Sequence, residues 1–221
     1  MIKAVYPPIF ELLGPEDSGK STVAELFLEA LPSDCHVMLI SADAQSDLAK
    51  QLGLEPSLTL ANVLEQAKET PLKLDSPEIM DWLMTELVLD VSLSLDKLNQ
   101  ELLCLGPMPT QLSQNEQALL DFALPRVFQH AQLIIADGNI DILKPSLKNF
   151  DIKPLLVIRP EDDEYCSVYN QTHFNVPNST ITTIQCILSK ASGEDMPPKS
   201  VLAQIHAGNW TLLGKIPRLP S

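Results

Sequence analysis

The feature that most constrains the fold is a glycine-rich stretch near the N-terminus, GPEDSGKS at residues 14–21. Its spacing, G-x-x-x-x-G-K-S, is typical of a loop whose backbone N–H groups hold phosphates, while the lysine reaches phosphate oxygens and the hydroxyl ligates Mg²⁺. The apolar run IFELL (9–13) predicts a buried strand before the loop, and the apolar spacing over 19–31 predicts a helix after it. This order predicts an α/β fold with a ligand at the helix N-terminus.

Two variable positions of this loop, Glu16 and Asp17, are acidic, and acids repel phosphates. We expect their side chains to point outward while the backbone and the lysine bind, so that the loop still holds a nucleotide. The alternative is a loop that keeps its shape and no longer binds. The loop residues predicted to bind the nucleotide are Gly14, Asp17, Ser18, Gly19, Lys20, Ser21 and Thr22.

The rest of the chain alternates short apolar runs with longer helical patterns, which predicts a three-layer, doubly wound and mainly parallel sheet with helices on both faces. Strands are predicted within 9–13, 36–41, 101–106, 132–139, 153–162, 180–190 and 210–220. Helices are predicted over 19–31, 47–54, 58–67, 76–95 and 113–131, the last with a kink at Pro125. We see no linker and no repeat, so a single domain over 1–221 is expected.

The charge of the chain excludes some partners. The formal net charge is -14, which argues against direct nucleic-acid binding and against an anionic membrane surface. The four cysteines, Cys35, Cys104, Cys166 and Cys186, have no C-x-x-C spacing and read as buried thiols. No signal peptide and no membrane-spanning run is visible, so a cytoplasmic location is expected.

Four further stretches resemble the MinD/ParA family of P-loop ATPases, including its nickel-insertion accessory branch. They are ISADAQSDLAKQLGL (40–54), EPSLTLANVLEQ (55–66), LIIADGN (133–139) and LLGKIPRLP (212–220). The resemblance is spread over most of the chain. It implies a P-loop NTPase that uses ATP and Mg²⁺.

Carried onto this sequence, the resemblance implies that Lys20 contacts the β- and γ-phosphates and that Ser21 ligates Mg²⁺. Asp43 is implied near the attacking water and the metal, and Asp137 is implied either to hold Mg²⁺ through a water or to orient the second switch segment. Both acids follow predicted strands, where open α/β sheets bind ligands. The alternatives are a helix N-cap for Asp43 and a turn residue for Asp137.

The sequence also departs from the family. Pro15 stands where the family has a second lysine that reaches a partner's nucleotide, so a homodimer would be weak, would use other contacts or would not form. The Cys-x-Cys pair of the nickel branch is missing, and IPRLPS replaces the basic helix that anchors the membrane-binding branch. The family often binds the adenine base through an Asn-Lys or Asn-Arg pair. Here the corresponding residues are Ser189-Lys190, and the backbone near Pro217 is the other candidate for contacting the base.

The function implied is a slow, Mg²⁺-dependent ATPase that acts as a switch for an unidentified protein partner. The apolar helix predicted over 76–97 is one candidate for the partner face, and ordinary core packing is the other. The alternatives are a catalytically silent scaffold and a small-molecule kinase or ATP-dependent ligase of the same superfamily. The basic residues are too scattered to favour a kinase or a ligase, which would need them to bind an acceptor.

Overall fold

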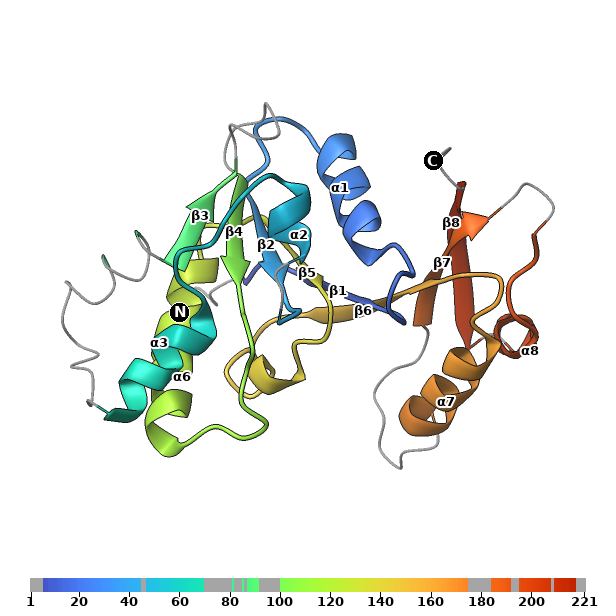
Figure 1. Cartoon of the computed structure of the whole chain (residues 1–221). Coiled ribbons are helices and arrows are strands. Elements are labelled where there is room, and N and C mark those ends of the chain that lie inside the picture. The colour runs from blue at the N-terminus through green and yellow to red at the C-terminus, as the bar shows by residue number, and fades with distance from the viewer. Residues whose placement is uncertain are drawn as a thin grey trace, which may run out of the picture. The chain divides into compact units, whose positions relative to one another are not determined.

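The computed structural model describes residues 6–44, 47–69, 81, 85, 87–91, 100–174, 184–191, 195–207 and 209–217. Its strands are β1 (Ile9–Leu13), β2 (Val37–Ser41), β3 (Val88–Asp90), β4 (Gln100–Cys104), β5 (Leu133–Asp137), β6 (Ile152–Ile158), β7 (Ile184–Ala191) and β8 (Trp210–Pro217). Its helices are α1 (Lys20–Ala30), α2 (Asp47–Gln51), α3 (Leu60–Glu69), α6 (Gln114–Phe128), α7 (Asp163–Phe174) and α8 (Lys199–His206), with a 3₁₀ helix at Asp141–Leu143. Figure 1 shows these elements along the chain.

The strands are hydrogen-bonded in the order β3-β4-β2-β5-β1-β6-β7-β8. β2 pairs in parallel with β4 and with β5, and β7 pairs in parallel with β6 and with β8. Every residue of β2 is buried, as expected of a parallel strand covered on both faces. The predicted α/β fold with a mainly parallel sheet is confirmed, and each predicted strand is present.

One predicted helix is wrong over part of its length. The pattern at 76–95 predicted a long apolar-faced helix, yet Val88–Asp90 is strand β3, antiparallel to β4. A short apolar run is compatible with either a helix or a buried strand, so the sequence pattern does not distinguish the two. Here the run pairs with β4 and forms a strand. Most of the predicted helix lies outside the described residues.

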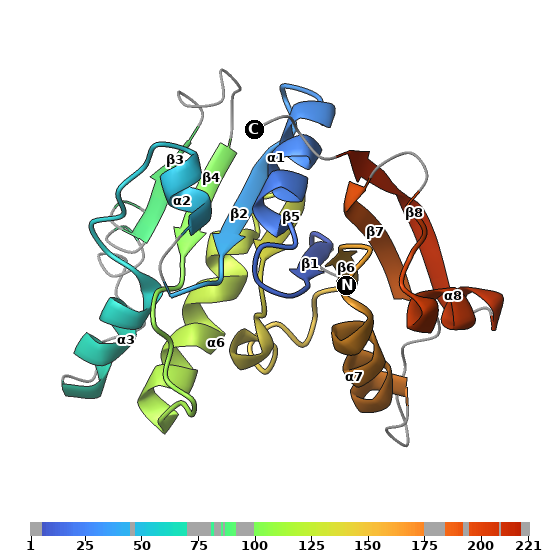
Figure 2. The ribbon, with the colours of Figure 1, turned by 45° about the vertical axis from the view of Figure 1, so that its right-hand side comes forward.

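The chain divides into two compact units, and the first comprises Met1–Glu11 and Ala24–Lys153. Its core joins Met38 and Ile40 of β2 to Val63 of α3 and Leu120 of α6. Figures 1 and 2 show α3 and α6 on one side of β4, β2 and β5, and α2 on the other side. Helices therefore cover both faces of the sheet within this unit, as predicted.

The second unit comprises Leu12–Val23 and Pro154–Ser221. α7 and α8 pack together on one face of β7 and β8, as Figure 2 shows. Tyr169 of α7 meets Trp210 of β8 edge to face, with ring centroids 6.2 Å apart. The sequence reading did not single out α7 and α8. The single domain expected over residues 1–221 stays a prediction.

The cysteine prediction is confirmed for three of the four thiols. Cys104, Cys166 and Cys186 are buried, and Cys35 is half-buried. Burial raises the pKa of Cys166 and the pKa of Cys186 to about 12, so both thiols are protonated at neutral pH and unreactive. No helix among the described residues is both long and apolar enough to cross a membrane.

Candidate functional site

Both glycines of the loop motif are required by its backbone. A Cβ atom on Gly14 would lie 2.1 Å from the carbonyl oxygen of Val157 in β6, so no side chain fits there. Gly19 has a φ of 90°, a left-handed conformation that is costly for residues with a Cβ atom. The two glycines are therefore needed because the backbone passes close to β6 at Gly14 and turns into α1 at Gly19.

Ser18 lies inside this loop. It is 0% exposed, and its Oγ atom has no hydrogen-bond partner. A Cβ atom on Gly14 would lie 2.7 Å from this oxygen, so the hydroxyl sits over the missing side chain of Gly14. A buried hydroxyl without a partner costs free energy, and a phosphate oxygen would supply the acceptor.

The cation and the helix of the motif complete the cradle. Lys20 Nζ donates to the carbonyl oxygens of Pro15, at 2.8 Å, and Gly14, at 3.2 Å. α1 begins at Lys20 and has no acidic residue in its first turn, so the positive end of its dipole is not neutralised from within. The unpaired hydroxyl, the ammonium and the helix N-terminus together fit a phosphate group.

Residues at the end of β7 donate hydrogen bonds to the loop backbone. Ser189 Oγ donates to the carbonyl oxygen of Ser18, and Lys190 Nζ donates to that of Asp17 at 2.5 Å. The sequence suggested that Lys190 contacts the nucleotide base, whereas in the structure its ammonium donates to the loop backbone. Ala191 pairs with Pro217 of β8, so Lys190, Pro217 and the loop come together in one unit. Nothing in sequence spacing indicated the Ser189 contact.

The acidic positions of the loop face solvent and have a basic neighbour. Glu16 and Asp17 are both exposed, as the sequence predicted. Arg159, just after β6, is held by Asp162 through an Nη2–Oδ1 contact of 2.8 Å. Hydrogen bonding to Asp162 raises the pKa of Arg159, and the charge of Asp17 contributes to the same shift. The charge of Asp17 is therefore partly balanced by Arg159.

The two predicted catalytic acids belong to the first unit, and it brings them together. Ser41 is in register with Asp137 across β2 and β5, and the Ala42 N–H donates to the Asp137 carbonyl at 3.0 Å. Ser41 Oγ donates to Asp43 Oδ2 at 3.0 Å. Asp137 is 4% exposed. α2 begins at Asp47, so Asp43 is not at its N-cap position and that alternative is wrong.

No group of three or more His, Cys, Asp or Glu side chains within the described ranges is arranged to hold a metal ion. A Mg²⁺ site that uses phosphate oxygens and waters needs only one or two carboxylates from the protein. The pair of Asp43 and Asp137 therefore suits a metal that arrives with a phosphate ligand.

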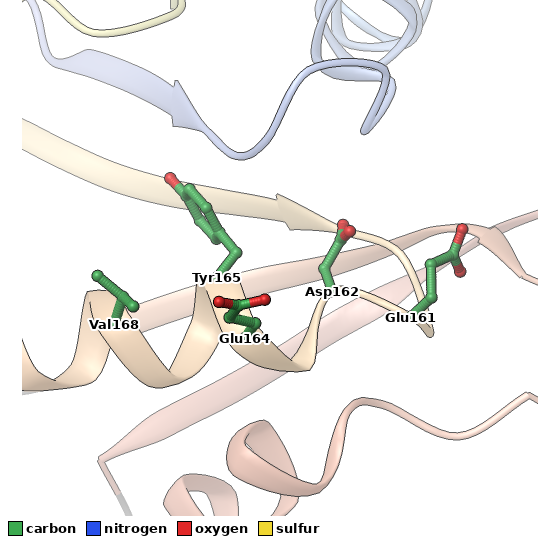
Figure 3. Close-up of a pocket in the computed structure, with 5 residues that line it drawn as sticks. All are labelled: Glu161, Asp162, Glu164, Tyr165 and Val168. Carbon is green, nitrogen blue, oxygen red and sulfur yellow. The ribbon is translucent and has the colours of Figure 1, made fainter.

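Two hollows are described on the surface, one in each unit. One, of about 420 Å³, is lined by Glu161, Asp162, Glu164, Tyr165 and Val168 at the start of α7 (Figure 3). Another, of about 430 Å³, is lined by Met108, Pro109, Thr110, Asn139, Asp141 and Ile142. The first carries three carboxylates, which repel phosphate, and neither includes a loop residue.

Comparison with known proteins gives the fold. No family model and no curated protein matches the sequence. A variant of McdA from Cyanothece in complex with ATP is 18% identical with a TM-score of 0.60, over 97% of this chain and 84% of that chain. MinD from Pyrococcus horikoshii with Mg-ADP is 19% identical with a TM-score of 0.56, over 97% and 82%.

A third solved structure is a biosynthetic enzyme of the same fold. Cobyrinic acid a,c-diamide synthase from Mycobacterium smegmatis, with bound ADP and magnesium, is 14% identical with a TM-score of 0.56, over 97% of this chain and 88% of that chain. The chain therefore has the fold of the MinD/ParA-like P-loop NTPases, as the sequence resemblance implied. This fold serves positioning proteins and enzymes alike, so it does not select between them.

Proposed function

We propose that this protein is a nucleotide-dependent switch that binds ATP with Mg²⁺, hydrolyses it slowly and presents its state to a protein partner. The observation that carries the proposal is the phosphate cradle, in which the buried Ser18 hydroxyl has no partner beside Gly14 and Lys20. The fold neighbours McdA and MinD support it, since each was solved with a nucleotide.

In this proposal the loop from Gly14 to Thr22 holds the phosphates through its N–H groups and Lys20. Ser21, Asp43 and Asp137 would hold Mg²⁺, which would neutralise phosphate charge, and Asp43 would also orient the attacking water. Pro217 and Lys190 lie at neighbouring strand ends beside the loop, and the base is assigned to this edge. The apposition of Ser41, Asp43 and Asp137 supports a shared role for the acids.

The second candidate is an ATP-dependent ligase, and the diamide synthase among the fold neighbours favours it. A ligase must bind an acceptor next to the nucleotide. The hollow at the start of α7 is acidic, which would suit a cationic acceptor. A silent scaffold is the third candidate, since Pro15 replaces the lysine expected for an ATP-linked dimer.

Calorimetric titration with ATP, ADP and GTP, each with and without Mg²⁺, separates these candidates when light scattering is recorded on the same samples. The switch predicts Mg²⁺-dependent ATP binding with slow release of phosphate and a change of mass, either by dimer formation or with a partner. Binding with fast turnover only in the presence of an amine-bearing acceptor supports a ligase. Absence of binding for every nucleotide overturns the proposed function and leaves the scaffold.

Lys20→Ala is expected to weaken ATP binding about 100-fold, because charge-assisted hydrogen bonds each contribute about 1.5–3 kcal/mol and the lysine serves two phosphates. The fold should persist, since the hydrogen bonds of Lys20 Nζ to Pro15 and Gly14 stay within the loop. Calorimetry measures the affinity and circular dichroism the fold. Lys199→Ala, at an exposed lysine in the same unit, is the matched control. Parental affinity in Lys20→Ala would exclude the loop as the binding site.

A further inference from the structure

An acidic side chain sits in the middle of an otherwise apolar strand. Glu11 belongs to IFELL of β1 and is 1% exposed. Burying an ionised carboxylate in a strand costs several kcal/mol unless it is paired and hydrogen-bonded. The residue must therefore be held by partners, and it has no place in the sequence motif or in the proposed chemistry.

The partners of Glu11 both come from the segment that follows β5. The Ile140 N–H donates to Glu11 Oε1 at 3.1 Å, and Lys144 Nζ lies 2.9 Å from Glu11 Oε2. Lys144 also contacts Asp141 Oδ1 at 2.5 Å. Burial opposes the Lys144 charge, but the bonds to Asp141 and Glu11 outweigh it, and the pKa of Lys144 is raised. Lys144 is therefore charged at neutral pH.

The segment gripped by Glu11 is a tight turn. The Asp141 N–H donates to Asn139 Oδ1 at 2.6 Å, and the Leu143 N–H donates to the Ile140 carbonyl at 2.8 Å. Asn139 and Asp141 side chains are also bonded to each other at 3.0 Å. Glu11 is the member of this network that lies in the sheet, so it ties the whole turn to β1.

This turn starts two residues after Asp137. Gly138 has a φ of 114°, and a Cβ atom there would lie 3.1 Å from the Cβ atom of Ala42, the residue before Asp43. A chain fixed at Asp137 by β5 and at Ile140 by Glu11 has two residues between the anchors, so neither can reorient alone. Movement of the turn would shift the end of β5 and the Ala42 contact together.

We propose that Glu11 is a positioning residue: through the Ile140 N–H and Lys144 it holds the 139–144 turn, and thereby keeps Asp137 beside Ala42 and Asp43. The inference rests on the proposed function, since that function assigns catalytic roles to Asp43 and Asp137. In this proposal Glu11 acts through the turn and not directly on the nucleotide or the metal.

Three variants and a control test the proposal. Glu11→Ala removes the acceptor of the Ile140 N–H and the Glu11 contact of Lys144, which keeps its contact with Asp141. Glu11→Gln keeps a side-chain oxygen for Ile140 and loses the charge. Glu11→Leu combined with Lys144→Met replaces the ion pair by apolar groups, an exchange that often leaves stability unchanged or raises it. Lys153→Met breaks a surface pair, Lys153–Asp151 at 3.2 Å with both side chains exposed, in the same unit.

The first readout needs no nucleotide. Amide hydrogen exchange of the free protein should speed up about ten-fold or more at Ile140 in Glu11→Ala and in the double variant, as expected for loss of a hydrogen bond to a charged group. Glu11→Gln should show a smaller change and Lys153→Met none. Parental exchange at Ile140 in both Glu11→Ala and the double variant would overturn the anchor, whatever the nucleotide result.

The second readout separates positioning from stability. In the double variant, the melting temperature should match the parent while kcat for Mg²⁺-dependent ATP hydrolysis falls about ten-fold or more, with Mg²⁺-free ATP affinity within about two-fold of the parent. A double variant that is stable and keeps the parental kcat overturns the positioning role. If the parent itself neither binds nor hydrolyses ATP, the proposed function fails and the catalytic part of this inference fails with it, while hydrogen exchange still decides the anchor.

Discussion

At the scale of single residues, Asp17 shows how an acidic residue is accommodated in the loop that we propose binds phosphate. Asp17 adopts a left-handed φ of 57°, which aspartate tolerates better than most residues but less well than glycine. Its carbonyl is held by Lys190 and its side chain is exposed. The carboxylate therefore contributes nothing visible to the loop backbone, and its charge opposes an anionic ligand.

Asp17→Gly is expected to tighten nucleotide binding about two- to five-fold at low salt, since removing one charge near a solvent-exposed phosphate changes the energy by about 0.5–1 kcal/mol. Stability should stay within about 1 kcal/mol of the parent, because glycine accepts the left-handed conformation. Calorimetry at two salt concentrations measures both the gain and its screening. Glu16→Gln removes a neighbouring charge without the change in backbone preference. An affinity that does not respond to either substitution would place both acids outside the field of the ligand.

At the scale of elements, α6 illustrates an acid that a helix terminus requires. Ser113 Oγ accepts from the Glu116 N–H at 3.3 Å, and Glu116 Oε2 accepts from the Ser113 N–H at 2.7 Å, so the two form a capping box. Glu116 is 1% exposed. Burial alone would raise the pKa of Glu116, but its bonds to Ser113 and the charge of Lys68 outweigh burial and lower it.

Glu116→Gln should cost about 1 kcal/mol of stability at pH 7, the usual contribution of a hydrogen bond to a buried group. A lowered pKa means that Glu116 stabilises the fold above its unfolded pKa and that this contribution is lost as pH falls through the folded pKa. The difference between parent and variant should therefore shrink towards pH 3. Urea unfolding at pH 7, 5, 4 and 3 measures it. Glu65→Gln, at a side chain 68% exposed that also pairs with Lys68, should show little difference at any pH, and an equal cost there would contradict the role of the cap.

At the scale of the whole molecule, charge sets which partners can approach. The chain carries 15 basic and 29 acidic residues. Association with a polyanion requires basic side chains that displace condensed counterions. Several basic side chains are engaged within the protein, with Lys20 and Lys190 on loop carbonyls and Lys144 on Glu11. We expect a protein partner with a basic surface and not a nucleic acid.

Titration of a fluorescent DNA duplex at low salt, with and without ATP and Mg²⁺, is expected to show no saturable binding below ~0.1 mM, the weak end of ordinary non-specific affinity. Raising the salt should leave this result unchanged and should raise the melting temperature, because it screens repulsion among the acidic groups. Binding that weakens steeply with salt would reveal a basic surface and contradict the expectation.

Much of the fold and half of the site follow from local sequence. The spacing of Gly14, Gly19 and Lys20 predicts the loop because each residue type is required by the local backbone conformation. The structure confirms that both positions need glycine. Apolar runs predict the strands because a buried parallel strand has no polar face to interrupt it. The same logic misassigned 88–90, where β3 pairs with β4, since a short apolar run carries no period that separates a helix from a strand.

The sequence by itself determined most of the strands, the glycine-rich loop and the placing of Asp43 and Asp137 at or just beyond strand ends, because these features depend on neighbouring residues. Only the tertiary structure decided which distant residues meet. Ser189 reaches the loop carbonyl of Ser18 across 171 positions, and Glu11 reaches Ile140 across 129. Such contacts depend on the order of strands in the sheet. Parallel strands have interchangeable apolar sequences, so local pattern cannot supply that order.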